Sequence, residues 1–155
     1  MSPATRYTLC RDMHGVVWDA LLYAPTVSAL GVFAVSSWYG DKQPVAYLLG
    51  FLACFFLIAG ANRILTTRLM WLPTAPVAIE VGTDTVDLVL KSGAIIGLRR
   101  DLKLYREKSA RTFGLTGLND QGKRCQFVFH RGQFGNDGDF QAVMSSIDRA
   151  ATSKA

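Results

Sequence analysis

Two stretches of this chain carry no charged residue, whereas much of the second half alternates apolar and polar positions. The first stretch runs from Ala20 to Gly40 and the second from Gln43 to Asn62. A helix rises about 1.5 Å per residue, so about 20 apolar residues cross the roughly 30 Å hydrocarbon core of a membrane. Neither stretch has a polar face, and only a short turn separates them. The pattern predicts a transmembrane hairpin over residues 16–72, with helices over about 16–40 and 44–66.

The residues that flank these stretches predict how the hairpin is oriented. Aromatic side chains near the ends suit the headgroup level of a bilayer, and they include Trp18, Trp38 and Trp71. Arg6 and Arg11 precede the first uncharged stretch and Arg63 and Arg68 follow the second, while the turn holds one lysine and one aspartate. The positive-inside rule then places both termini in the cytoplasm. A secretory signal cleaved near residues 34–36 is the alternative interpretation of the first stretch.

Small residues recur every four positions on each predicted helix. They are Ala20, Ala24 and Ser28 on the first, and Ala46, Gly50 and Cys54 on the second. Small side chains let backbones approach closely, which drives helix association in lipid. These six positions are the predicted helix–helix packing sites, within the hairpin or against a neighbouring subunit, unless they are small only because such residues are common in membrane helices. Asp19 is expected at the membrane interface, in the first turn of the first helix.

The second half of the chain changes to a period of two, which is typical of strands with one buried face. The expected strands are 77–81, 86–90, 94–98, 102–106, 112–118 and 125–130. The last two predict a hairpin in which Phe113 and Leu115 face Phe127 and Phe129. Residues 73–155 are therefore expected to form a cytosolic domain of about six or seven antiparallel strands.

The chain ends with a helical period. Residues 137–151 place an apolar stripe on one face, made of Phe140, Val143, Met144, Ile147 and Ala151. Asp137 or Asp139 suits the N-cap. A twisted sheet of this size leaves an open end, which this helix is expected to cover. The predicted fold class is α+β, with an N-terminal two-helix transmembrane hairpin, an antiparallel β domain and a C-terminal helix. Residues 1–15 are expected to be a separate cytosolic segment.

This order of elements resembles the bacterial pleckstrin-homology-like (PH-like) membrane proteins of the YcxB-like kind, which have two spans. The segments that carry the resemblance are AIEVGTDTVDLVL at 78–90, IIGLRRDLKLYRE at 95–107 and FVFHRGQFGNDGDFQAVMSSI at 127–147. The resemblance implies a PH-like barrel and a scaffold or assembly role, and it supplies no catalytic residues. With the orientation above, the expected location is the bacterial inner (cytoplasmic) membrane.

Composition adds little chemistry to this picture. The formal net charge of +5 over 155 residues is modest for a nucleic-acid-binding surface. The cysteines Cys10, Cys54 and Cys125 lack CxxC spacing and are expected to be reduced thiols. Cys125 with His130 is a weak pair for a metal site. No nucleotide-binding or hydrolase motif occurs, so neither a cofactor nor a metal nor a catalytic residue is predicted, and the chain is not expected to be an enzyme.

The densest basic segment is 99–111, in which six basic residues accompany two acidic ones. The basic residues are Arg99, Arg100, Lys103, Arg106, Lys108 and Arg111. Close to an anionic leaflet, each exposed base adds about 1 kcal/mol of attraction. An acidic patch on a partner protein would use the same side chains. A solvated loop with interspersed charge is the third interpretation.

We therefore expect a membrane-anchored, non-enzymatic scaffold, assembly factor or accessory subunit of a larger membrane-protein complex, which docks through its β domain. The alternative is a sensor of an anionic lipid headgroup or a small ligand that uses residues 99–111. The expected partners are the lipid bilayer and other membrane-protein subunits, with anionic lipid in the alternative. Nucleic acid is not an expected partner, because Tyr105 is the only aromatic residue within the basic segment.

Overall fold

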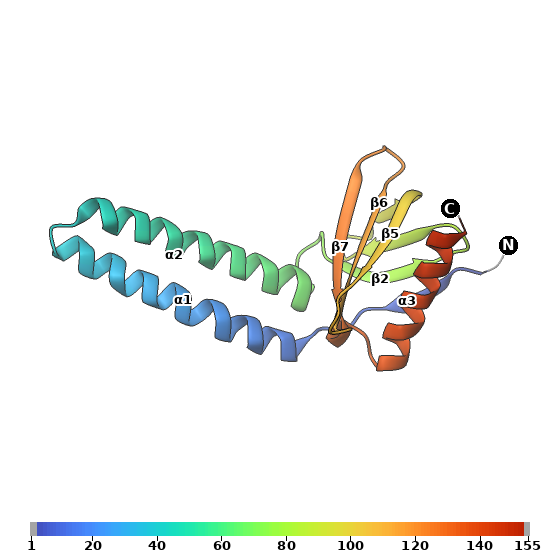
Figure 1. Ribbon diagram of the computed structural model, residues 1–155, viewed down its shortest axis with the longest axis horizontal. Helices are drawn as coiled ribbons and strands as arrows, with labels where there is room; N and C mark the ends of the chain where they lie inside the picture. The colour runs from blue at the N-terminus through green and yellow to red at the C-terminus, as the bar shows by residue number, and fades with distance from the viewer. Residues whose placement is uncertain (1–2, 154–155) are drawn as a thin grey trace. The chain divides into compact units, whose positions relative to one another are not determined.

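The computed structural model describes residues 3–153 and divides them into two compact units. One unit comprises the residues up to Asp12 and from Met70 onward, and the other is Met13–Leu69. Residues 1, 2, 154 and 155, which end the predicted cytosolic segments, lie outside the described residues. The predicted α+β organisation is confirmed, with two long apolar helices, antiparallel sheets and a C-terminal helix (Figure 1).

The helical unit is an antiparallel pair, α1 (Met13–Tyr39) and α2 (Gln43–Arg63), whose helices run side by side. Pro44 lies in the first turn of α2, where its missing N–H removes no helical hydrogen bond. The chain continues from α2 through a π-helical turn, η1 (Ile64–Arg68). Among the described residues, Met13–Tyr39 and Gln43–Arg68 are two helical stretches long and apolar enough to span a membrane, judged by length and composition.

Over residues 3–153, seven strands form two antiparallel sheets, which together with α3 are called the β domain. The four-stranded sheet has the order β1 (Thr5–Thr8), β2 (Pro76–Val81), β3 (Val86–Leu90) and β4 (Ile95–Leu98). The three-stranded sheet has the order β5 (Arg100–Arg106), β6 (Thr112–Leu118) and β7 (Arg124–His130). Strands β2 to β7 coincide with the predicted strands within two residues at each end. Phe113 lies opposite Phe129 and Leu115 opposite Phe127, as the alternation predicts.

The strand β1 comes from the segment that precedes the helices. It pairs antiparallel with β2, with Tyr7 opposite Ile79. Beyond it, the Leu9 N–H donates to the Val77 carbonyl (2.9 Å), and the Cys10 N–H donates to the Gln133 carbonyl (2.6 Å). The structure therefore differs from the predicted division, since the segment expected to stand alone supplies an edge strand to the β domain. The helical pair is an insertion between two hydrogen-bonded strands of one sheet.

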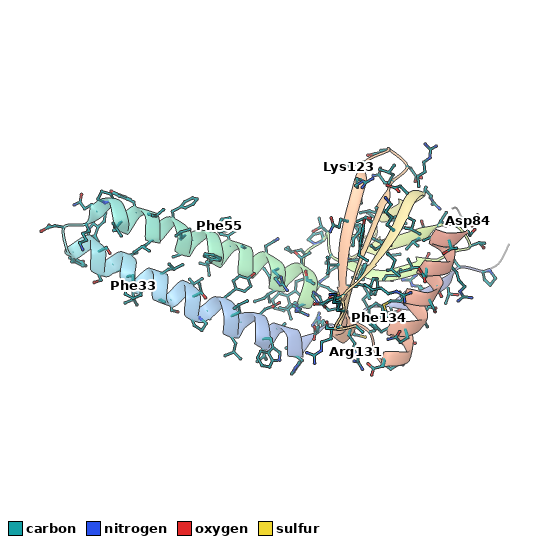
Figure 2. All side chains as sticks on the ribbon, in the orientation of Figure 1. Phe33, Phe55, Asp84, Lys123, Arg131 and Phe134 are labelled. Atoms are coloured by element: carbon teal, nitrogen blue, oxygen red, sulfur yellow. The ribbon has the colours of Figure 1, made fainter. Side chains whose placement is uncertain are left out.

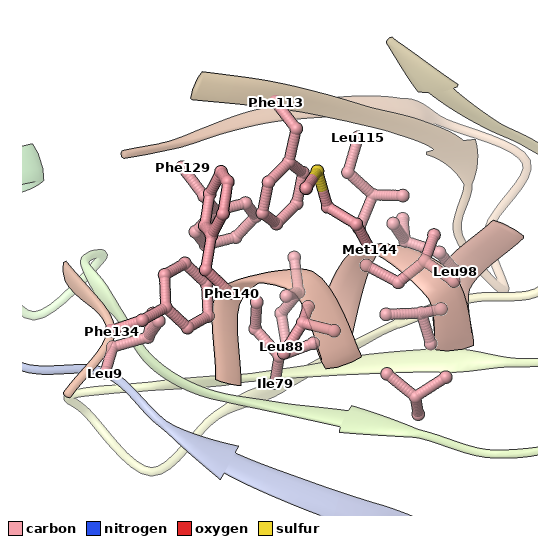
Figure 3. Packing of buried hydrophobic residues seen from close by; sticks show 14 of the residues in the cluster. Leu9, Ile79, Leu88, Leu98, Phe113, Leu115, Phe129, Phe134, Phe140 and Met144 are labelled. Atoms are coloured by element: carbon pink, nitrogen blue, oxygen red, sulfur yellow. The ribbon is translucent and has the colours of Figure 1, made fainter. Parts of the chain in front are cut away.

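The helix α3 (Asp137–Thr152) packs into the core between the sheets. Its buried residues are Phe140, Val143, Met144, Ile147 and Ala150. The ring of Phe113 lies 5.3 Å from that of Phe129, 6.0 Å from Phe134 and 5.6 Å from Phe140, measured between centroids (Figure 3). Burying each such side chain contributes about 1.5–3 kcal/mol. This aromatic cluster is the centre of the β domain.

Two details of α3 differ from the sequence-based prediction. The N-cap is Asn136, whose side chain accepts a hydrogen bond from the Asp139 N–H at 2.7 Å. Asp137 does not cap the helix, because its carboxylate accepts from Arg131. The apolar stripe also ends on Ala150 rather than on Ala151, which is only partly buried.

Candidate interaction surfaces

The two helices of the hairpin meet most closely where Gly60 of α2 lies against Tyr23 of α1. A Cβ at residue 60 would lie 2.7 Å from Tyr23 Cγ, closer than real Cβ atoms come. Near the turn between the helices, the rings of Trp38 and Tyr47 pack edge to face with centroids 5.5 Å apart. The glycine lets the ring of Tyr23 lie against the backbone of α2, as small residues do between membrane helices.

The six predicted packing residues lie along the two sides of the interface between α1 and α2. Ala46 is buried, Ala20 and Gly50 are partly buried, and the exposed ones are Ala24, Ser28 and Cys54. They line two depressions in the described part of the hairpin, one of about 370 Å³ on Ala20, Ala24 and Ser28 and one of about 520 Å³ on Ala46, Gly50 and Cys54. Small side chains at these positions leave space on the hairpin surface. The close contact at Tyr23 and Gly60 was not singled out by the four-residue spacing.

Asp19 has partners that the sequence did not reveal. Its carboxylate is buried and accepts from Arg68 Nε at 2.8 Å and from Arg63 Nε at 3.4 Å. Arg68 is the last residue of the π-helical turn η1, in which the Leu69 N–H donates to the Ile64 carbonyl. Such turns are rare and recur at functional positions. The three side chains form a charged cluster of net charge +1 that ties α1 to the end of α2.

Half of the predicted basic residues are held by carboxylates of the β domain. In the described part of the chain, Arg99 pairs with Asp87 (3.3 Å) and with Asp120 (3.4 Å), Lys103 with Asp101 of its own strand (3.3 Å), and Arg106 with Asp148 of α3 (3.0 Å). Arg100, Lys108 and Arg111 are exposed and form no ion pair with a described carboxylate. Arg100 begins β5, and the other two lie in the turn after it, so a strand length on the order of 20 Å separates them.

Titratable groups near the turns of the β domain have pKa values shifted away from neutrality. The hydrogen bond from Arg131 lowers the pKa of Asp137 and raises that of Arg131. The hydrogen bond from Thr112 lowers the pKa of Glu107. A general acid or base works best with a pKa near the operating pH. These exposed groups therefore stabilise local turns, and their shifts do not prepare them for proton transfer.

The remaining chemical candidates are dispersed over the structure. Among residues 3–153, no group of three or more His, Cys, Asp or Glu side chains is arranged to hold a metal ion. Asp84 accepts a hydrogen bond from Ser153, and Cys125 and His130 lie at the two ends of β7. In comparisons with known proteins, the chain matches no protein-family model, no curated protein and no solved structure.

Replacing Gly60 with alanine is expected to destabilise the helical pair by about 1–3 kcal/mol, because the added Cβ would overlap the Tyr23 ring. The matched control is Gly50→Ala, since a Cβ at that position would meet no described atom within 4 Å. Both changes alter helix propensity equally, so their difference isolates the contact. Unfolding of the detergent-solubilised chain by SDS, followed by fluorescence of Trp18 and Trp38 in a Trp71→Phe background, measures the effect. Equal stability of the two variants would contradict the contact.

Replacing Asp19 with asparagine is expected to cost about 3–5 kcal/mol, because the charge of Arg68 then stays buried opposite a neutral amide. The control is Glu80→Gln, which breaks the exposed Arg6–Glu80 pair and is expected to cost at most about 1 kcal/mol. Thermal unfolding of the full-length chain in detergent compares them. Adding Arg68→Gln to the Asp19→Asn variant should recover part of the loss. No recovery would show that the pair is not the cause.

Proposed function

We propose that this chain is a two-span protein of the bacterial inner membrane that acts without catalysis, as a scaffold, assembly factor or accessory subunit of a larger membrane-protein complex. Its hairpin anchors a PH-like β domain, and this domain docks on partner subunits. The observation that carries the proposal is the insertion, because one folded domain holds both ends of an apolar helical hairpin.

The outer surface of the hairpin supports membrane insertion. Large apolar side chains are exposed along both helices, among them Phe33 and Phe55 at 62% and 56% (Figure 2). Soluble monomers rarely expose contiguous apolar patches larger than a few hundred Å². With 27 residues, α1 is about 40 Å long, which exceeds the roughly 30 Å hydrocarbon core. Lipid is the solvent that suits such a surface.

The pairing of β1 with β2 supports a topology with both termini on one side. β1 precedes α1 and β2 follows α2, yet the two strands are neighbours in one sheet. A hairpin that leaves and rejoins the sheet must return to the side of the membrane on which it began. The arginines that end α2 and η1, Arg63 and Arg68, then favour the cytoplasm as that side by the positive-inside rule.

The architecture of the β domain supports the PH-like assignment. Strands β1–β4 form one antiparallel sheet, β5–β7 form the other, and the C-terminal helix α3 fills the space between them. This arrangement agrees with the barrel and closing helix that the resemblance implies. Folds of this kind serve many functions, so the PH-like assignment concerns the architecture alone. The function of the β domain depends on the residues on its surface.

An apolar row on the outer face of the three-stranded sheet supports docking. Tyr105, Gly114 and Val128 lie side by side on β5, β6 and β7. Tyr105 and Val128 are exposed, and the glycine between them leaves the Tyr105 ring accessible. Exposed aromatic and apolar groups next to polar neighbours are typical of protein interfaces. The alternative, a lipid-headgroup or small-ligand sensor using residues 99–111, has less support because half of its basic residues already pair with carboxylates.

Topology is tested by cysteine accessibility in intact cells. In a chain whose native cysteines are replaced by serine, Asp41→Cys in the turn between the helices is expected to react with a membrane-impermeant maleimide. Lys123→Cys, at the turn between β6 and β7, is expected to react only after lysis. Labelling of Lys123→Cys from outside would contradict the proposed orientation, and full solubility of the chain without detergent would contradict insertion.

Docking is tested by purification in mild detergent followed by mass spectrometry. A stoichiometric membrane-protein partner is expected to copurify with the full-length chain. Tyr105→Glu is expected to remove that partner, because a carboxylate would be buried in the apolar row. The matched control, Lys123→Glu at the exposed tip of the β6–β7 hairpin, should retain it. A preparation that contains only copies of this chain would contradict docking on other subunits.

A further inference from the structure

Within the described residues, the two sheets have four edge strands, and three of these are protected against further pairing. β1 and β4 contain only four residues each. β5 contains seven, but a bulge between Arg100 and Lys103 interrupts its pairing with β6, and α3 packs against it. Four of the seven β5 residues are charged. Short length, bulges and charges are the usual devices that keep an edge strand from pairing with another chain.

The fourth edge strand, β7, lacks these devices. It pairs with β6 without a bulge over all seven of its residues, and it lies on the outside of its sheet (Figure 1). It contains no proline, and its one charged residue is Arg124 at its first position. Gln126 and Val128 are exposed on it. A regular edge of this length, with a single charged residue at one end, is a template for another strand.

The hydrogen bonds around β7 show which of its backbone groups face outward. The Arg131 N–H donates to the Arg111 carbonyl (2.8 Å), and the Asn119 N–H donates to the Lys123 carbonyl (3.0 Å). Hydrogen-bonded pairs alternate along an antiparallel ladder, so the odd-numbered residues of β7 bond to β6. The even-numbered residues direct their N–H and C=O groups away from β6, and they are Arg124, Gln126, Val128 and His130.

Gln133 blocks the backbone N–H at one end of this row of outward-facing groups. Its side-chain oxygen accepts from the His130 N–H at 2.8 Å, and the residue is 1% exposed. The donor that an added strand would need at His130 is therefore already bonded. The remaining outward residues are Arg124, Gln126 and Val128, and this row is symmetric about Gln126.

We infer that a second copy of this chain occupies the edge, through antiparallel pairing of β7 with β7 about a two-fold axis at Gln126. In this register Gln126 faces Gln126, and Arg124 of each copy faces Val128 of the other. Three hydrogen-bonded pairs give about six backbone hydrogen bonds. A register centred on Phe127 would instead bring Arg124 opposite His130, whose N–H is bonded to Gln133. The position of Gln133 thus disfavours symmetric registers that bring His130 into the pairing.

The side chains of β7 are compatible with a second copy. On the outer face, two Gln126 amides meet, and amides both donate and accept. On the inner face, Cys125 of one copy lies beside Phe127 of the other, and Phe127 is only partly buried at the edge of its sheet. Arg124 faces an apolar residue, so no like charges are opposed. An isologous contact of this kind uses one patch twice, which is the commonest symmetry of oligomers.

The pairing is tested by a disulfide across the two-fold axis. Gln126→Cys is introduced into the full-length chain with its native cysteines replaced by serine, and the Cα atoms at 126 would lie about 5.5 Å apart, within the range of a disulfide. Mild oxidation in native membranes is expected to give a product of twice the chain mass. Gln121→Cys, exposed in the β6–β7 turn, is the matched control and should give none. Absence of the product, or a product with another protein, would overturn the inference.

Substitutions at Val128 test whether the edge itself makes the contact. The Val128 N–H faces outward, so Val128→Pro removes an edge donor without removing a bond to β6. Cross-linking at 126 is expected to fall on the order of tenfold, because each strand loses a backbone donor. Val128→Lys, which keeps the donor but adds a charge to the edge, should also lower it, and Val128→Thr should not. Unchanged cross-linking in Val128→Lys would overturn the inference even if the proline variant did not fold.

The dimer and the proposed docking function can fail separately. The disulfide at 126 reports on copies of this chain, whereas copurification reports on other subunits. The outward groups of β7 are also independent of Tyr105, whose substitution should leave the cross-link unchanged.

Discussion

The hydrogen bonds between β1 and β2 constrain the rest of this molecule. They join two segments that the whole helical hairpin separates along the chain. Both junctions are also buried in the core of the β domain, through Leu9 after β1 and Met70 before β2. The domain therefore holds its insertion at both ends. If the hairpin enters lipid, its start and its end must lie on the side where the domain has folded.

Charge is distributed in agreement with this arrangement. The helices carry apolar surface along their length, and the buried carboxylate of Asp19 is neutralised where α1 begins and η1 ends. In the β domain, Arg99 pairs with a carboxylate of β3, Lys103 with one of its own strand β5, and Arg106 with one of α3. Isolated surface pairs contribute little stability, but these pairs reduce the positive charge presented to a membrane or a partner. The uncharged outer row at Tyr105 is consequently the more distinctive surface.

Periodicity predicted most of the fold, because most elements bury one face of their own. Strands such as 86–90 and the stripe of α3 could be recognised without knowledge of their partners. β1 could not, since its four residues include one inward aromatic, Tyr7, and its partner strand follows the hairpin. Asp19 was recognised as unusual, but its partner Arg68 comes into reach through a π-helical turn that sequence patterns do not indicate. The ion pairs that engage half of the basic side chains in segment 99–111 likewise depend on tertiary contacts such as that of Arg106 with Asp148, so they could not be predicted from the sequence.

The position of β1 also determines when the four-stranded sheet can form during synthesis of the chain. About seventy residues separate Tyr7 from Ile79, the residue with which it pairs. At a ribosomal rate of roughly 5–20 residues per second, the synthesis of these residues takes several seconds. During that interval the first strand has emerged without its neighbour. The four-stranded sheet closes only after the hairpin has been translated in full. A chain truncated within the hairpin therefore cannot form the native β domain. The sheet is complete only in chains that already contain the whole hairpin.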